Sequence, residues 1–547
     1  MYQLTKLENN LESLLLEFNI SEKIDIRLSK DESYDLQINN LVKYQNHPKI
    51  NEILKRFKNE LGNESFIKEY SIGNKNFINI EVNLHEFINS LENIRNFIKV
   101  HNPQSIIFDY GGPNIGKPLH VGHLRSLNIG RSLYNINKLA GNKVFSDIHL
   151  GDWGMPIAQI IQYGIENKID FKKITIEELE EIYPSASDLY LKNIQFMESA
   201  QTINKSLNEN NKDLINVWKN IKSVSLKSLK STLEKLYHDF DLWKGESDVN
   251  SLIPPMLESL KEKNKISQDD GAYISNLETD PKILITKSDG SYLYLTTDLA
   301  TVLDRLKNTM FDKTFYVVDK RQKLHFEQLF SSLKYFDFPD KEYAHISFGT
   351  LNDSEGNPFK TREGGTKKLI DLFDETYNYI EKINEKLDEN SKHILTNTVL
   401  TYSDLITNRN TDYKFDLEKF TNVNGKTGIY IQYANVRANK LLTDSLLDTS
   451  DFSIKISKLD DSDKNLLKSF IKFEFYFQQA IQNNEPHHLA DYLYELSRQF
   501  NAMYQGVNIL ENPDSDLKHN KLINTKFFLR YSSLLMECLG ILPVKKM

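Results

Sequence analysis

The chain has 547 residues, of which 39% are hydrophobic and 26% are charged, and its formal net charge is -8. It is too long for one hydrophobic core, and its composition is that of a globular protein, so we expect about three or four folded domains and neither a disordered nor a fibrous class. No run of about 18 apolar residues and no signal-peptide pattern is present, which predicts a cytoplasmic protein without a membrane span. The single cysteine, Cys538, excludes an intrachain disulfide and a cysteine-rich zinc site.

The first 102 residues predict a small α/β domain. Apolar residues follow helical spacing in LESLLLEF and INEILKRF, and NFINIEVN then has the character of a strand.

A βαβ unit follows Pro103. SIIFDY predicts a strand, GGPNIGKP a loop, LHVGHLRSLNIGRSLYNINKLAG a helix that ends at Gly141, and KVFSDI a second strand. This order implies a Rossmann-like parallel sheet that binds ligand at the carboxyl ends of its strands, so we expect the site at residues 111–123.

Residues 103–390 are predicted to form this domain, with a polar, helical insertion at about 165–260. KILITK and YLYLTT predict strands after the insertion. TFYVVD, LHFEQLFSSLKYF and HISFGTL then predict a strand, a helix and a strand. Residues 391–547 have helical periodicity nearly throughout and predict an all-α bundle.

The strongest chemical signal is PLHVGH. His120 and His123 stand three residues apart at a predicted helix start, where unpaired backbone N–H groups and imidazole donors suit a polyphosphate, and Gly122 leaves room for adenine. Pro113 in the preceding loop belongs to the same nucleotide site. A metal site is the alternative use of two histidines, but no acidic or cysteine ligand has suitable spacing nearby.

DYGGPNIGKPLHVGHLRS resembles the signature of the arginyl-tRNA synthetases, a class I family with a His-x-Gly-His motif on a Rossmann-type domain. HLGDWG, FDLWKGES, YLYLTTD, VVDKRQKLH and FGTLNDSEGNPFKTREGG follow in the family's order. The resemblance covers nearly the whole chain. It implies ATP-dependent activation of L-arginine, with Mg²⁺, and transfer to the 3′-terminal ribose of tRNA(Arg), by a protein that is a monomer.

An arginine pocket needs carboxylates in fork geometry and an aromatic or hydroxyl partner, because a guanidinium keeps its proton. Tyr294 and Asp298, four residues apart, could supply these groups. A packed strand tyrosine and a helix-capping or solvated aspartate are the structural alternative. The resemblance assigns both to arginine, together with a further set that contacts the amino acid: Asp109, Asn114, Glu246 and Gln322.

The second class I signature, Lys-Met-Ser-Lys-Ser, is degenerate here. Phe359, Lys360, Thr361 and Arg362 occupy its place without the second lysine. The resemblance implies that Lys117, before the histidine motif, replaces that lysine as a stabiliser of transition-state charge, and that Lys360, Thr361 and Arg362 close over ATP on a mobile loop. Gly111 and Gly112 also depart from the family, which more often has small hydroxyl residues there.

The C-terminal bundle resembles an anticodon-binding domain, and the N-terminal domain resembles one that contacts the tRNA elbow. The residues expected near tRNA are Phe77, Asn79, Tyr433, Arg437, Tyr504 and Met547. Tyrosines can stack on unpaired bases, although most tyrosines at helical spacing are core residues.

Three other functions are compatible with parts of this pattern. A synthetase for another amino acid is disfavoured by the acidic pocket, and a nucleotidylyltransferase by the long helical C-terminal region. A tRNA-binding paralogue without catalysis is disfavoured because both histidines, Lys117 and the pocket residues are present.

Overall fold

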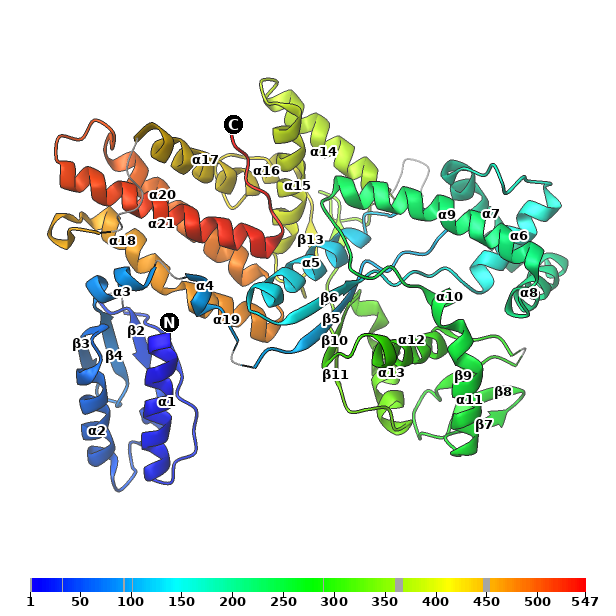
Figure 1. Ribbon diagram of the computed structural model, residues 1–547, viewed down its shortest axis with the longest axis horizontal. Helices are drawn as coiled ribbons and strands as arrows, with labels where there is room; N and C mark the ends of the chain where they lie inside the picture. The colour runs from blue at the N-terminus through cyan, green and yellow to red at the C-terminus, as the bar shows by residue number, and fades with distance from the viewer. Residues whose placement is uncertain are drawn as a thin grey trace. The chain divides into compact units, whose positions relative to one another are not determined.

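The computed structural model of the chain describes residues 2–31, 33–91, 94–100, 102–288, 290–359, 367–445 and 453–547. The chain divides into two compact units, whose elements are labelled in Figure 1. The first unit consists of Met1–His101, Leu387–Thr398 and Lys419–Met547, and the second of Asn102–Lys386 and Val399–Glu418. Helix α15 (Glu389–Leu405) contributes residues to both units.

The N-terminal part of the first unit is an antiparallel sheet with strand order β1-β2-β4-β3. Helix α2 buries Ile53, Phe57 and Leu61, which are four residues apart and therefore share one face. The α/β character predicted for this part is confirmed. Its elements are α1 (Tyr2–Glu17), β1 (Ile26–Leu28), β2 (Leu36–Ile38), η1 (Asn40–Tyr44), α2 (Ile50–Asn63), β3 (Ile67–Ile72), β4 (Ile78–Val82), α3 (Leu84–Ser90) and α4 (Ile94–Phe97).

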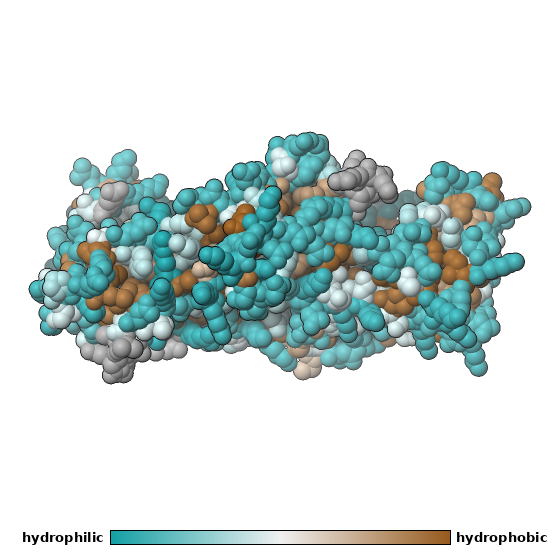
Figure 2. Space-filling model, turned by 90° about the horizontal axis from the view of Figure 1, so that it is seen from above, coloured by the Kyte–Doolittle hydropathy of each residue, from teal (hydrophilic) through white to brown (hydrophobic). Residues whose placement is uncertain are grey.

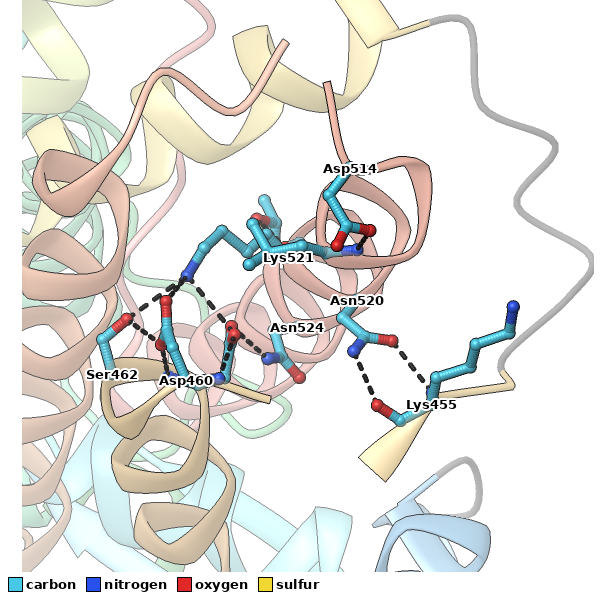
Figure 3. Close-up of polar contacts among 10 residues, drawn as sticks. Lys455, Asp460, Ser462, Asp514, Asn520, Lys521 and Asn524 are labelled. Atoms are coloured by element: carbon cyan, nitrogen blue, oxygen red, sulfur yellow. Dashed lines mark hydrogen bonds and ion pairs between the residues drawn. The ribbon is translucent and has the colours of Figure 1, made fainter. Parts of the chain in front are cut away.

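The C-terminal part of the first unit is the predicted helical bundle. Its elements are α17 (Gly428–Ser445), η5 (Ile456–Lys458), α18 (Asp461–Ile471), α19 (Phe473–Asn483), α20 (His487–Gly506) and α21 (Ser515–Leu539). The short helix α16 (Leu417–Phe420) contributes residues to both units. Polar contacts join α18 to α21 inside the bundle (Figure 3). The fully buried Lys521 donates to Asp460 at 2.7 Å, and Asn524 donates to Asp463 at 2.9 Å. These partners satisfy a charge that would otherwise be costly to bury.

The second unit is built on a parallel sheet with strand order β11-β10-β5-β6. Because β6 and β10 lie on opposite sides of β5, the order reverses beside β5, and ligands bind at such a switch point outside the carboxyl ends of the strands. The predicted Rossmann-like sheet is confirmed. Its elements are β5 (Ser105–Tyr110), α5 (His123–Leu139), β6 (Lys143–Asp147), β10 (Lys313–Val317), η4 (Lys320–Gln322), α13 (Lys323–Tyr335) and β11 (Glu342–His345).

The first helices within the predicted insertion are α7 (Ile176–Lys192), α8 (Ile194–Asn208) and α9 (Lys212–Lys235). They share a hydrophobic core with the preceding helix α6 (Met155–Glu166) and with Ile115 of the loop after β5. The remaining elements of the unit are α10 (Glu246–Val249), η3 (Asn250–Leu252), α11 (Ile253–Glu262), β7 (Ile266–Asp269), β8 (Ala272–Ser275), β9 (Leu284–Thr286), α12 (Tyr294–Asn308), β12 (Leu351–Asn352), α14 (Leu369–Ile383) and β13 (Tyr413–Lys414).

Three predicted elements differ from the structure. YLYLTT (292–297) is not a strand, since helix α12 begins at its third residue, Tyr294, and Leu295, Leu299 and Val302 are buried at helical spacing that extends beyond this short window. HISFGTL is not a single strand, since β11 ends at His345 and β12 begins at Leu351. The helix after the histidine motif begins at His123, so His120 precedes it.

The surface seen in Figure 2 is mainly hydrophilic, and its apolar areas are small and separate. Among the described residues, no helix has both the length and the apolar content that a membrane span requires.

Candidate active site

The loop after β5 is fixed to the neighbouring strand by one serine. Ser126 of α5 accepts a hydrogen bond from the backbone N–H of Gly111 at 2.8 Å and donates to the carbonyl of Val317 at the end of β10, at 2.7 Å. Gly111 has φ +85°, and a Cβ there would lie 2.8 Å from the side chain of Leu127. A glycine therefore suits this close turn at the switch point.

The rings of His120 and His123 lie together, with centroids 3.9 Å apart. The backbone N–H of Gly122 donates to Nδ1 of His120 at 3.1 Å, which leaves Nε2 as the protonated nitrogen of a neutral ring. Burial, together with the nearby charge of Lys117, lowers the pKa of His120 to about 4 and that of His123 to about 3. Both rings are thus neutral hydrogen-bond donors near pH 7.

Gly122 leaves space for the ring of His120, in addition to the space expected for adenine. A Cβ at this position would lie 2.8 Å from Cε1 of the His120 ring. The ring of His120 therefore occupies the space that a side chain at position 122 would need.

Lys117 lies over an aromatic ring of the insertion. Its Nζ is 4.9 Å from the ring centroid of Tyr183 in α7, and burial lowers its pKa. The cation–π contact and partial burial restrict the orientation of the Lys117 ammonium. An ammonium held in this way can interact with a negatively charged group of a bound substrate.

Glu246 and Tyr294 line one cavity, together with Trp153, Thr297 and residues of α8. Tyr294 is the first residue of α12 and is 62% exposed, whereas Glu246 is buried. Burial, together with the carboxylates of Asp298 and Asp152, raises the pKa of Glu246 to about 8. A carboxyl group in this condition is poised to accept a cation, because the cation would stabilise its ionised form.

Asp298 lies one turn after Tyr294 in α12, and its carboxylate is fixed from the neighbouring helix. Oδ2 of Asp298 is 2.6 Å from Nε2 of His325 in α13. Asp298 is therefore not the N-cap of α12, which is Leu293, and its carboxylate, on a side chain that is 26% exposed, has a protein partner.

Asp109, one of the residues expected to contact arginine, already pairs with a cation of the protein. Its carboxylate forms an ion pair with Arg305 of α12, and the same Nη2 donates to Asp147 of β6 at 2.7 Å. Arg305 is 1% exposed and also donates to the hydroxyl of Tyr316, at 3.3 Å. Burial raises the pKa of Asp109, while Arg305 opposes that rise. Asp109 thus has a partner within the protein, Arg305, independently of a contact with substrate.

Asn114 and Gln322, which were also expected to contact arginine, are not among the residues that line the Glu246 cavity. Asn114 forms a parallel bridge with Gly151, and the backbone N–H of Gly151 donates to the carbonyl of Pro113 at 3.0 Å. Gln322 is exposed in the short helix η4. Lys360, Thr361 and Arg362 lie outside the described residues.

The residues expected near tRNA form one cluster and several separate positions. The Arg437 guanidinium lies 4.2 Å from the ring centroid of Tyr433 and 5.5 Å from that of Tyr504, and it donates to Asn501 at 3.0 Å. Tyr433 is 39% exposed. Phe77 and Met547 are half-buried, and Asn79 is buried and accepts a hydrogen bond from Gln37 at 2.7 Å.

The sequence prediction did not include Arg305, Asp147, His325 or Tyr183. One signal for Arg305 was available, because it stands seven residues after Asp298 and thus on the same face of an α-helix. His325, Asp147 and Tyr183 come from other segments, and their proximity depends on tertiary structure.

Comparison with known proteins gives consistent results over both parts of the chain. Residues 86–417 match the catalytic domain of the class I tRNA synthetases (R), and residues 431–547 match the DALR anticodon binding domain. The arginine–tRNA ligase of Alkaliphilus oremlandii is 35% identical over 524 residues, which cover 89% of each chain. That of Francisella tularensis subsp. novicida is 34% identical over 465 residues, or 80% of each chain.

Solved structures agree in fold. The crystal structure of arginyl-tRNA synthetase from Plasmodium falciparum has a TM-score of 0.80 and 25% identity, and the match covers 99% of each chain. The Thermus thermophilus arginyl-tRNA synthetase has a TM-score of 0.81 at 18% identity, covering 99% of this chain and 100% of that one.

Proposed function

We propose roles for individual residues on the premise that this chain belongs to the class I arginyl-tRNA synthetase family and is an arginine–tRNA ligase. The family is ATP-dependent, and its substrates are arginine and tRNA. The observation that carries the proposal is the cavity shared by Glu246 and Tyr294, next to Asp298 on α12. A buried carboxyl group, a phenol and a second carboxylate meet the requirements of a guanidinium.

In the proposed arginine site, Glu246, Tyr294 and Asp298 bind the guanidinium. Asp109, Asn114 and Gln322 contact the rest of the amino acid, and Arg305 keeps the Asp109 carboxylate ionised and in place. The arginine carboxylate is then directed at the switch point, where the histidine motif lies.

In the proposed ATP site, Pro113 and Gly122 border the nucleotide, and the imidazoles of His120 and His123 donate to phosphate oxygens. Lys117 adds positive charge as the arginine carboxylate attacks the α-phosphorus and pyrophosphate leaves. Lys360, Thr361 and Arg362 close over ATP. In the second step a ribose hydroxyl at the 3′ end of tRNA attacks the activated carbonyl of arginyl-adenylate and AMP leaves, so no protein nucleophile is required.

Mg²⁺ is expected with ATP. The groups that the motif offers are imidazole, ammonium and backbone N–H donors, which suit phosphate oxygens, whereas Mg²⁺ prefers oxygen ligands. We therefore expect phosphate oxygens and water to hold the ion and neutralise the phosphate charge. Among the residues that the structure describes, the one group of three potential metal ligands is Glu485, His487 and His488, in the bundle.

The proposed tRNA contacts are Phe77 and Asn79 in the N-terminal domain and Tyr433, Arg437, Tyr504 and Met547 in the bundle. The partly exposed Tyr433 and the adjacent guanidinium of Arg437 support an interaction with unpaired bases, since both groups stack on nucleobases. The domain boundaries at residues 102 and 390, a monomeric state and a cytoplasmic location stay predictions.

ATP–pyrophosphate exchange with purified protein tests the proposal. We expect exchange with arginine in the presence of tRNA(Arg), and none with lysine or cysteine. Absence of arginine-dependent exchange, both with and without tRNA, would contradict the proposed chemistry even if the protein still bound tRNA.

A further inference from the structure

Helix α8 of the insertion carries one polar residue on its buried face. The buried residues of this helix are Phe196, Ala200, Ile203, Asn204 and Leu207. Their spacing is that of a helix packed against a core, and Ile203 and Leu207 belong to the hydrophobic core that α8 shares with α6, α7 and α9. Asn204 thus occupies a position where the pattern would place an apolar side chain.

The carboxamide oxygen of Asn204 has no hydrogen-bond partner among the described residues. The residue is 6% exposed, and its Oδ1 is buried and accepts no hydrogen bond within the described ranges of the chain. A buried polar group without a hydrogen-bond partner destabilises the folded protein, because it has lost its hydrogen bonds to water. Such a group therefore calls for an explanation. A bound ligand that supplies a donor is one.

Asn204 lines the same cavity as Glu246 and Tyr294. Asn208, one turn later on the same face of α8, also lines it and accepts a hydrogen bond from Nε1 of Trp153 at 2.9 Å. This contact and the packed core behind α8 hold the asparagine face of the helix against the cavity. The carboxamide of Asn204 is therefore held by rigid surroundings at the wall of the cavity.

We propose that Asn204 is a specificity-determining residue that accepts a hydrogen bond from the guanidinium of the substrate arginine. The inference rests on the proposed function of the Glu246 cavity. A guanidinium has five N–H donors and no acceptor, so two carboxylates and a phenol leave room for a further acceptor. A neutral carboxamide adds that acceptor without adding a third negative charge beside Glu246 and Asp298.

The assignment also explains why the binding wall belongs to the insertion. Tyr294 begins α12, which follows the insertion, whereas Glu246 and Asn204 both lie within the insertion predicted at about 165–260. Arginine bound between α12 and the insertion would touch both, so its side chain would link the insertion to the sheet domain.

The test compares Asn204→Leu and Asn204→Asp with wild type in tRNA-dependent exchange at pH 8.5. Leucine removes the acceptor at similar volume, and aspartate keeps an acceptor in the same place. We expect Asn204→Leu to raise the KM for arginine about 10- to 100-fold, with little change in the KM for ATP, and Asn204→Asp to stay closer to wild type. Lys205→Ala, at an exposed position of the same helix, is the matched control and should leave both KM values unchanged.

Thermal unfolding without ligand separates a binding role from a structural one. Because Oδ1 has no partner in the described part of the chain, Asn204→Leu should leave Tm unchanged or raise it. An arginine KM within twofold of wild type would overturn the inference, and so would a lowered Tm together with equal changes in the KM for arginine and ATP. If wild-type protein shows no arginine-dependent exchange, the proposed function itself fails. If wild type is active and Asn204→Leu behaves like it, only the role of Asn204 fails.

Discussion

His325 Nε2 lies 2.6 Å from Oδ2 of Asp298, which joins α13 to the carboxylate that we assign to the guanidinium. His325 acts in this account as a positioning residue. We expect His325→Ala to raise the KM for arginine roughly three- to tenfold, the loss typical of one hydrogen bond, while the KM for ATP stays unchanged. Steady-state exchange kinetics measure both. Glu327→Ala, at an exposed position of α13, is the control, and an equal rise in both KM values would contradict a role through Asp298.

Lys117 is expected to act on the transition state. Lys117→Met should lower kcat for arginine activation about 100- to 1000-fold, as does the loss of other groups that stabilise developing charge, and should leave the KM for arginine within threefold of wild type. Single-turnover formation of arginyl-adenylate is the appropriate measurement. The exposed Lys172 provides the control variant, Lys172→Met. A raised KM with normal kcat would show instead that Lys117 serves ground-state binding.

Arginine binding should depend on pH through Glu246. Burial raises the pKa of this carboxyl to about 8, so the free enzyme carries it mainly protonated below that pH. The guanidinium needs the carboxylate, and binding must therefore release a proton. The KM for arginine should fall by up to about tenfold per pH unit as pH rises from 6.5 towards 8, and then level off.

The control for this pH dependence is Glu246→Gln. That variant should bind arginine more weakly at pH 8.5 and should lose most of the pH dependence, because glutamine does not titrate. A wild-type KM that is flat between pH 6.5 and 8.5 would contradict the assignment of Glu246 to the guanidinium.

Removing Arg305 should destabilise the protein. Arg305→Met leaves the buried Asp109 and Asp147 without their cation, which costs about 3–5 kcal/mol. Scanning calorimetry should show a Tm that is lower by several degrees, with partial recovery when Asp147→Asn is added, since one of the two uncompensated charges is then removed. Lys282→Met, which breaks the exposed pair with Asp269, should change stability by less than about 1 kcal/mol. Equal effects of the two single variants would argue against the buried network.

The sequence was sufficient to predict the elements with long periodic patterns. The apolar runs of β5 and β6 and the helical spacing of α2 and α20 predicted the sheet domain, the N-terminal domain and the bundle, because one face of each element must be buried. YLYLTT was interpreted wrongly, since six residues of tyrosine, leucine and threonine satisfy a strand pattern although the last four of them begin a much longer helix.

The contacts within the site could not be predicted from local patterns. Asp109 and Arg305 are 196 residues apart in the chain. The cavity combines residues from three segments: the one that follows β6, the insertion and α12. The Oδ1 atom of Asn204, which lacks a partner among the described residues, and the hydrogen bond that fixes His120 become visible only when the neighbours of each atom are known. Burial, which raises the pKa of Glu246, is likewise a property of the folded chain.

The measurement that tests the central claim most directly is the ATP-dependent transfer of labelled amino acids to tRNA, by wild-type protein and by Asp298→Asn. We predict that wild type attaches arginine, and no other amino acid, to tRNA(Arg), and that Asp298→Asn does so with an arginine KM at least tenfold higher, since the loss of a hydrogen-bonded charge costs about 1.5–3 kcal/mol. Transfer of a different amino acid by wild type, or an unchanged arginine KM in the variant, would contradict an arginine site built around Glu246, Tyr294 and Asp298.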